Sequence, residues 1–145
     1  EEHPTTSISY NNLATIYTRQ GEYKKAEGFC KRALSIREKV LGENHPSTAR
    51  SYRNLAGIYV GEGENDKAKK LYWKVWKIDR KVFGENHPDT ATSYFNLAAL
   101  YQKQGCLDMA CKLYKRSFEV RERILGKDHP ATLASANCLF QVTGK

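Results

Sequence analysis

Four histidines, each followed by proline, are the first residues in this sequence whose type and spacing could do chemistry. They are His3, His45, His87 and His129, and they lie 42 residues apart. Histidine can ligate metals or transfer protons near neutral pH. A constant separation instead places one histidine in each successive structural repeat, about two helix diameters of ~10 Å from the next. We therefore interpret all four as structural, with no metal-binding or catalytic role.

Three related pentapeptides carry the later histidines. They read GENHP at 42–46 and 84–88 and GKDHP at 126–130. Gly42 is expected to end one helix in the left-handed conformation, and Pro46 to begin the next helix where no backbone N–H is needed. The pentapeptides therefore predict turns between helices.

Each period is expected to contain two helices, which in the second period cover 46–62 and 64–83. In the first of these, Tyr52, Leu55, Ala56 and Tyr59 follow the i, i+3, i+4, i+7 spacing of a buried stripe. The stripe predicted for the second helix consists of Ala68, Leu71, Tyr72, Val75, Ile78 and Val82, with Trp76 at its edge. The repeats span about 3–44, 45–86 and 87–128, and a lone helix follows within 129–145. We expect residues 1–145 to form one solenoid.

Small and aromatic residues recur at defined places in these helix pairs. In the first period they are Leu13, Ala14, Tyr17, Gly21, Ala26 and Ala33, which match the tetratricopeptide repeat (TPR) pattern. The runs NNLATIY at 11–17, CKRALSIREKVLGENHP at 30–46 and RERILGKDHPAT at 121–132 resemble the 42-residue repeats of kinesin light chains and of related nephrocystin-type proteins. The resemblance implies an all-α, right-handed superhelical solenoid of antiparallel helix pairs. It also implies an adaptor in microtubule transport by motor proteins, with a concave groove lined by the first helix of each pair.

The groove is expected on the face of each first helix that lies opposite its buried stripe. An Asn amide both donates and accepts hydrogen bonds, so one Asn per repeat could pair with the backbone of an extended peptide, and the resemblance supports that role. Arg can bind carboxylates in a bidentate fork. The alternatives are that the Asn residues stabilise the stack and that the Arg residues form a solvated face. The predicted peptide-binding residues are Asn11, Asn12, Arg19, Arg50, Arg53, Asn54, Phe95, Asn96 and Lys103.

Composition narrows the function further. Lys and Arg number 24 against 16 Asp and Glu, which gives a formal charge of +8 and favours acidic partners. The four cysteines form no C-x-x-C pair, and no phosphate-binding glycine loop or nucleophile–base spacing occurs. We expect no enzyme activity and no cofactor. No apolar run approaches membrane-spanning length, so we expect a cytoplasmic protein that, through the resemblance, is associated with the cytoskeleton.

The leading hypothesis is an adaptor that binds a short, extended acidic peptide or a cargo-adaptor protein. Kinesin heavy chain is a partner only if the parent protein is a true light chain. Nucleic-acid binding is a weaker alternative, because the basic residues of the second helices alternate with Glu. Self-association through the last helix, 131–142, is a third, since Ala134, Leu139 and Phe140 lack a partner helix there.

Overall fold

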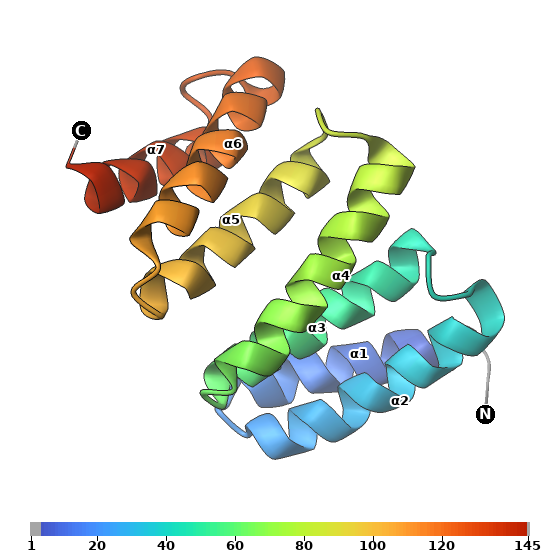
Figure 1. Ribbon diagram of the computed structural model, residues 1–145. Helices are drawn as coiled ribbons and strands as arrows, with labels where there is room; N and C mark the ends of the chain where they lie inside the picture. The colour runs from blue at the N-terminus through green and yellow to red at the C-terminus, as the bar shows by residue number, and fades with distance from the viewer. Residues whose placement is uncertain (1–3, 145) are drawn as a thin grey trace. The chain divides into compact units, whose positions relative to one another are not determined.

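The computed structural model describes residues 4–144, which form seven α-helices and no strand (Figure 1). The helices alternate with short turns, as the repeated pentapeptides predict. Their bounds are α1 (Pro4–Arg19), α2 (Tyr23–Leu41), α3 (Pro46–Gly61), α4 (Asn65–Phe83), α5 (Pro88–Lys103), α6 (Leu107–Leu125) and α7 (Pro130–Thr143). The chain divides into two compact units, Glu1–Ile78 and Asp79–Lys145, which are described separately.

The pentapeptides end one helix and begin the next in the same way each time. Nδ1 of His45 accepts a hydrogen bond from the backbone N–H of Ser47 at 3.0 Å, and His87 and His129 do the same for Asp89 and Ala131. Each histidine is therefore the N-cap of a helix that has Pro in its first turn. The structural interpretation of these three histidines is confirmed, whereas His3 lies outside the described residues.

Gly42 does not adopt the left-handed helical conformation that we expected. Its φ of 91° and ψ of 163° lie in an extended region at positive φ, which L-residues with a Cβ rarely enter. Gly126 has almost the same dihedral angles, φ 91° and ψ 159°. The glycine still ends the helix, but its backbone is extended toward the histidine N-cap and does not form a left-handed helical turn.

The core of the first unit lies between α2, α3 and the part of α4 up to Ile78. Ala49, Tyr52, Val75 and Ile78 are buried together, with Leu34 and Leu71 packed against them. Burial of each large apolar side chain stabilises the fold by about 1.5–3 kcal/mol. The small side chains of Ala14, Ala26, Ala33 and Ala56 are also buried in this unit.

The core of the second unit lies between α5, α6 and α7. Leu97, Ala98, Ala110, Leu113, Tyr114 and Val120 are buried there. The stripes predicted for the second period are largely confirmed, because the buried residues include Tyr52, Leu55, Ala56, Tyr59, Ala68, Tyr72, Val75 and Ile78. Val82 is an exception, because it is 45% exposed near the C-terminal end of α4.

A buried polar pair recurs between the second helix of one repeat and the first helix of the next. Arg37 donates to Ser51 Oγ at 3.0 Å, Ser93 donates to Asp79 Oδ2 at 3.1 Å, and Arg121 donates to Ser135 Oγ at 2.8 Å. The three serines are almost completely buried. Because buried polar groups are costly unless paired, these contacts fix how neighbouring helices meet.

Several basic side chains lie over tyrosine rings within a repeat. Arg32 lies over Tyr10 at 5.8 Å, Lys74 over Tyr52 at 4.5 Å and Arg116 over Tyr94 at 5.6 Å from the ring centroids. Cation–π contacts of this kind contribute about 0.5–1 kcal/mol each at exposed sites. Part of the positive charge therefore stabilises the helix pairs.

Candidate functional site

The first unit has a hollow of about 370 Å³ between α1 and α3. Its lining combines polar residues with small or apolar ones. The lining residues are Ala14, Thr15, Thr18, Arg19, Arg53, Asn54, Gly57 and Ile58. An extended segment of another chain could lie in such a shallow, open site.

Three of the predicted peptide-binding residues meet in this hollow. Arg19 comes from the last turn of α1, while Arg53 and Asn54 come from the middle of α3. Arg19 and Asn54 are exposed, and Arg53 is half-buried. Two guanidinium groups and one amide therefore surround a single space, which suits a carboxylate beside a peptide bond.

No carboxylate lines the hollow. Arg19 makes no ion pair within residues 4–144, and its guanidinium group is open to solvent. The two threonines donate their hydroxyl protons within α1, Thr15 to Asn11 O at 3.0 Å and Thr18 to Ala14 O at 2.7 Å. The hollow therefore carries positive charge that acidic groups in its lining do not neutralise.

Asn11 of α1 and Arg50 of α3 lie near Arg37, an arginine of α2. When the Asn11 amide is oriented to suit its neighbours, its oxygen accepts from Arg37 Nη1 and Nη2 at 2.9 and 3.0 Å. Arg37 also donates to Ser7 Oγ at 3.3 Å and to Ser47 O at 2.9 Å. Asn11 thus holds α1 against α2, a stabilising role that the sequence had left open for Asn12, Asn54 and Asn96.

Arg37 has only neutral acceptors among the described residues. Burial, and after it the charge of nearby Arg50, lowers the pKa of the Arg37 guanidinium. Arg50 is exposed and makes no ion pair in residues 4–144. The α1–α3 side of the first unit therefore carries more positive charge than the hollow alone contributes.

The other predicted residues lie outside the hollow. Asn12 is exposed on α1 but is not part of its lining. Phe95, Asn96 and Lys103 lie on α5 of the second unit. The Phe95 ring meets Tyr114 edge-on at 5.5 Å, and the Arg121 guanidinium lies 4.7 Å from its centroid, so Phe95 contributes to packing within its own unit.

Two features of the site could not be assigned from the periodic pattern alone. Arg37 is on a second helix, and its long side chain reaches residues of α1 and α3. Gly61, at the end of α3, lies against the ring of Tyr23, so that a Cβ on Gly61 would collide with the ring. The sequence did contain a sign of this close contact. Position 61 is glycine, whereas the equivalent positions of the other repeats are Arg19 and Lys103.

Features typical of a metal site are missing from the described part of the chain. Residues 4–144 contain no group of three or more His, Cys, Asp or Glu placed to hold a metal ion. Burial raises the pKa of the Cys30 thiol to about 12, so Cys30 stays protonated and packs as a small apolar side chain. No helix in this part is long and apolar enough to cross a membrane.

Comparison with known proteins places these features in a family. Residues 5–75 and 90–131 each match the tetratricopeptide repeat family. No curated protein sequence matches the chain significantly. A Podosopora anserina protein, named as a kinesin light chain of nearly identical TPR-like repeats, matches with a TM-score of 0.87 and 30% identity over 99% of this chain and 70% of its own.

Two further solved structures share the fold. BtubC (BKLC) from P. vanneervenii matches with a TM-score of 0.87 and 25% identity over 98% of this chain, which spans 58% of BtubC. The apo form of RapI has a TM-score of 0.86 at 18% identity, covering 99% of this chain and 50% of RapI, and shows the fold alone.

The helix pairs, the period and these matches define a protein of the tetratricopeptide repeat family, an all-α solenoid fold that serves as a non-catalytic scaffold for protein–protein interaction. The chain belongs to this family. Within it, the repeats are of the kinesin light chain-like kind, as the matched 42-residue units and the Podosopora structure show.

Proposed function

We propose that the chain binds a short, extended acidic peptide in the hollow between α1 and α3. One observation carries the proposal: Arg19, Arg53 and Asn54 surround one space whose lining contains no carboxylate. A peptide carboxylate would pair with a guanidinium group through charge-assisted hydrogen bonds, each of which contributes about 1.5–3 kcal/mol. The Asn54 amide would pair with the peptide backbone beside it.

Asn12 occupies the same repeat position as Asn54 and is proposed to contact the same peptide beside the hollow. Asn96 occupies this position in the second unit, where it is proposed to contact a peptide in the same way. Lys103 is exposed on α5 and would add a further cation. Arg50 would attract acidic residues that flank the bound segment. The proposed role is that of an adaptor, and a cargo-adaptor protein is the proposed source of the peptide.

The similarity to kinesin light chain-like proteins suggests a wider setting. A role in motor-driven transport on microtubules, in the cytoplasm and near the cytoskeleton, follows if the parent protein also binds kinesin heavy chain. Co-precipitation of the full parent protein with kinesin heavy chain tests this extension. Its failure would leave peptide binding by the repeats unaffected.

Affinity for a labelled acidic peptide that contains one Trp tests the groove. The variant Arg19→Ala/Arg53→Ala should bind at least tenfold more weakly, since each guanidinium–carboxylate bond contributes roughly 1.5–3 kcal/mol. Lys112→Ala/Lys115→Ala is the control, because both lysines are exposed on α6 and make no ion pair in residues 4–144. Equal affinities of the two variants would exclude the hollow.

Self-association is a second candidate, favoured by one surface. Leu133 and Phe140 of α7 are 48% and 58% exposed, and exposed apolar groups on one helix are typical of a contact surface. Sedimentation velocity over a range of concentrations should show dimers, and Leu133→Ser/Phe140→Ser should abolish them. A wild-type chain that stays monomeric at the highest concentration would rule this candidate out.

A further inference from the structure

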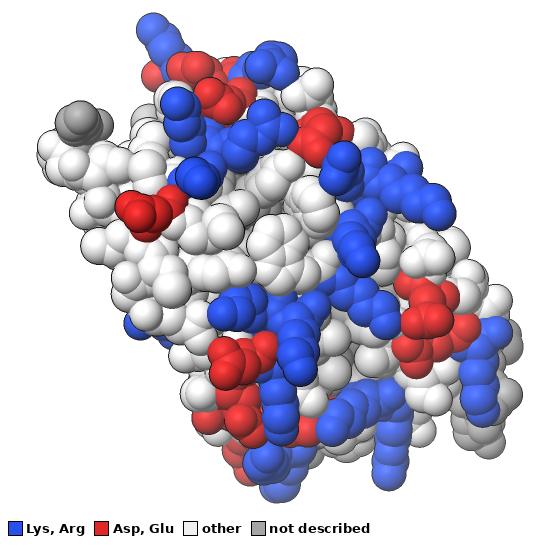
Figure 2. All heavy atoms as spheres, in the orientation of Figure 1, with Lys and Arg blue, Asp and Glu red and all other residues white. Residues whose placement is uncertain are grey.

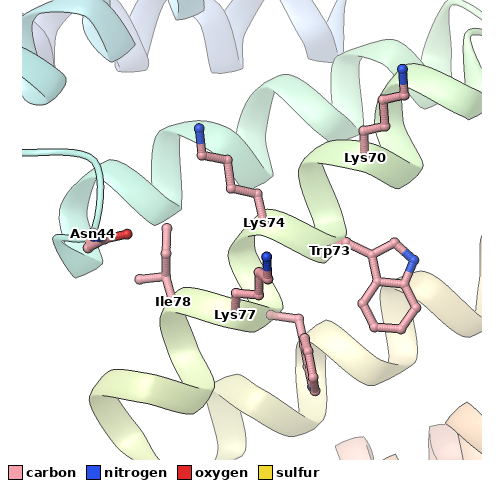
Figure 3. A pocket seen from close by; sticks show the side chains of 7 residues that line it. Asn44, Lys70, Trp73, Lys74, Lys77 and Ile78 are labelled. Atoms are coloured by element: carbon pink, nitrogen blue, oxygen red, sulfur yellow. The ribbon is translucent and has the colours of Figure 1, made fainter.

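A second hollow of the first unit lies on α4, apart from the groove residues. It encloses about 540 Å³ and is lined by Asn44, Lys70, Trp73, Lys74, Trp76, Lys77 and Ile78. Figure 3 shows Lys70, Trp73, Lys74 and Lys77 projecting from α4, with Asn44 facing them from the turn before α3. This volume is within the range of small-molecule sites, about 300–1,000 Å³. We call this hollow the α4 pocket.

Two tryptophans form the aromatic part of the α4 pocket. Their ring centroids are 5.3 Å apart and the planes meet at 89°, so Trp73 and Trp76 stand edge to face. Both are partly buried. At the position of Trp73 the other two repeats have Lys31 and Lys115, so the indole here is not required by the repeat fold.

Three lysines supply the charge of the α4 pocket. Lys74 is already engaged, because it pairs with Glu43 at 3.1 Å and lies over Tyr52. Lys70 and Lys77 are exposed and have no ion-pair partner among the described residues. They are seven residues apart on α4, which is about 10 Å along the helix axis. Figure 2 shows such basic side chains beside uncharged surface on the face in view.

The kinds of cation and ring indicate which ligand the α4 pocket would suit. Lysine offers a compact point charge that attracts phosphate or carboxylate, whereas the arginine fork binds either group through two parallel hydrogen bonds. The pocket contains three lysines and no arginine. Indole rings stack on planar bases, whatever the base. Phosphate and a planar ring together are the groups of a nucleotide.

We propose that the α4 pocket binds a nucleotide-type ligand, with its planar ring against Trp73 and its phosphates between Lys70 and Lys77. The site is independent of the peptide groove. A free nucleotide and single-stranded nucleic acid present the same groups. The pocket size and the ~10 Å span of the two lysines favour one nucleotide unit, because an oligonucleotide needs a longer basic track.

Isothermal titration with ADP tests the proposal, with adenosine and pyrophosphate as separate probes of ring and phosphates. ADP should bind at least about tenfold more tightly than either fragment. Trp73 and Trp76 are the two tryptophans of the sequence, so saturable quenching of indole fluorescence by ADP should give the same affinity. Absence of saturable ADP binding, or binding of an oligonucleotide but not of ADP, would overturn the proposal.

The variant Trp73→Lys separates stacking from charge. It introduces the residue that both other repeats carry there, so the helix should tolerate it. Loss of stacking should weaken ADP binding about tenfold, although the added charge alone would strengthen it. Trp73→Phe should restore part of the affinity. Thermal unfolding of each variant checks the fold, and unchanged or tighter ADP binding by Trp73→Lys in a folded protein would refute the stacking.

A second pair of variants tests the lysines. Lys70→Gln/Lys77→Gln should weaken ADP binding about tenfold and leave adenosine binding unchanged. Lys112→Gln/Lys115→Gln removes the same number of charges from exposed positions on α6 and should leave both unchanged. Equal loss of ADP affinity in the two double variants would show that net charge, and not the α4 pocket, attracts the phosphates.

Discussion

The groove between α1 and α3 and the α4 pocket belong to the same unit but use different cations. The groove is lined by two arginines, an asparagine and two threonines together with small or apolar residues, whereas the α4 pocket has three lysines beside two tryptophans. A guanidinium group binds carboxylate or phosphate through two parallel hydrogen bonds, whereas an ammonium group attracts either anion as a point charge. The net charge of +8 is therefore divided between surfaces of different chemistry.

Both surfaces arise where equivalent positions of the repeats carry different residues. At the position of Arg53 the first and third repeats have Asn11, which binds Arg37, and Phe95, which packs on Tyr114. The exposed position of Lys31 and Lys115 carries Trp73 in the second repeat. The second repeat thus contributes the distinctive residues of both surfaces. Repeat position alone does not determine what a residue does.

The largest expected effect comes from exchanging charges at the two sites in turn. Arg19→Glu/Arg53→Glu and Lys70→Glu/Lys77→Glu each lower the net charge by four, from the +8 of the sequence. The groove variant should lose about 100-fold in affinity for the acidic peptide, and the pocket variant about as much for ADP. Each should keep its affinity for the other ligand within about threefold. Titration of both ligands into both variants measures this.

If both variants lose both ligands equally, long-range charge dominates and the distinction between the two surfaces disappears. If only the groove variant loses affinity for its ligand, the α4 pocket is a gap left by side-chain packing and is not a binding site for ADP. Circular dichroism and thermal unfolding should be unchanged in both, because the four substituted side chains lie at the surface or line open hollows.

A smaller effect is expected from the helix contact that positions α3 beside α2. A Cβ at Gly61 would collide with ring carbons of Tyr23, whereas a Cβ at Gly28 of α2 would meet nothing within 4 Å. Gly61→Ala should therefore reduce the unfolding free energy by about 1–3 kcal/mol. Gly28→Ala should raise it by about 0.5–1 kcal/mol, because alanine is the better helix former. Urea unfolding measures both.

Gly61→Ala also distinguishes the two surfaces. The groove contains residues of α3, whereas six of the seven residues that line the α4 pocket belong to α4. Peptide affinity should fall more than ADP affinity in this variant. A wild-type stability for Gly61→Ala would mean that Tyr23 rotates away without cost.

The fold and the helix ends could be predicted well from the sequence because residues with defined chemical roles mark each helix boundary. Glycine at positive φ, histidine as N-cap and proline in the first turn define each boundary locally, so helices such as α3 lie within a residue or two of the prediction. The groove face remains a prediction from helical spacing, although Arg19, Arg53 and Asn54 do line one hollow. The hydrogen bonds of Asn11 could not be predicted, since the long Arg37 side chain reaches it from another helix.

The glutamates of the pentapeptides provide a smaller, pH-dependent test. Hydrogen bonding from Tyr94, and then the charges of Arg116 and Arg80, lowers the pKa of Glu85 from 4.5. A carboxylate with a lowered pKa stabilises the fold at higher pH, and this contribution is lost as the pH falls through 4.5 toward the folded-state value. Glu85→Gln should therefore destabilise the protein at neutral pH by about 0.5 kcal/mol or less, since the contacts are partly exposed.

Unfolding measured across the acid range should show the wild type and Glu85→Gln converging as the pH decreases. Glu119→Gln is the control, because Glu119 of α6 makes no ion pair in the described residues. A difference between the wild type and Glu85→Gln that persists at low pH would mean that Glu85 stabilises the fold through packing instead of charge.

A similarly small effect is expected at Glu43, which occupies the same pentapeptide position one repeat earlier and borders the α4 pocket. Glu43 binds Lys74 at 3.1 Å and is largely exposed. Glu43→Gln would leave Lys74 without its counter-charge, so ADP affinity should rise about two- to threefold, in keeping with the small energy of an exposed ion pair. Peptide affinity should not change. Glu64→Gln, which removes the exposed partner of Lys67 instead, should affect neither ligand, and a matching gain there would assign the effect to net charge.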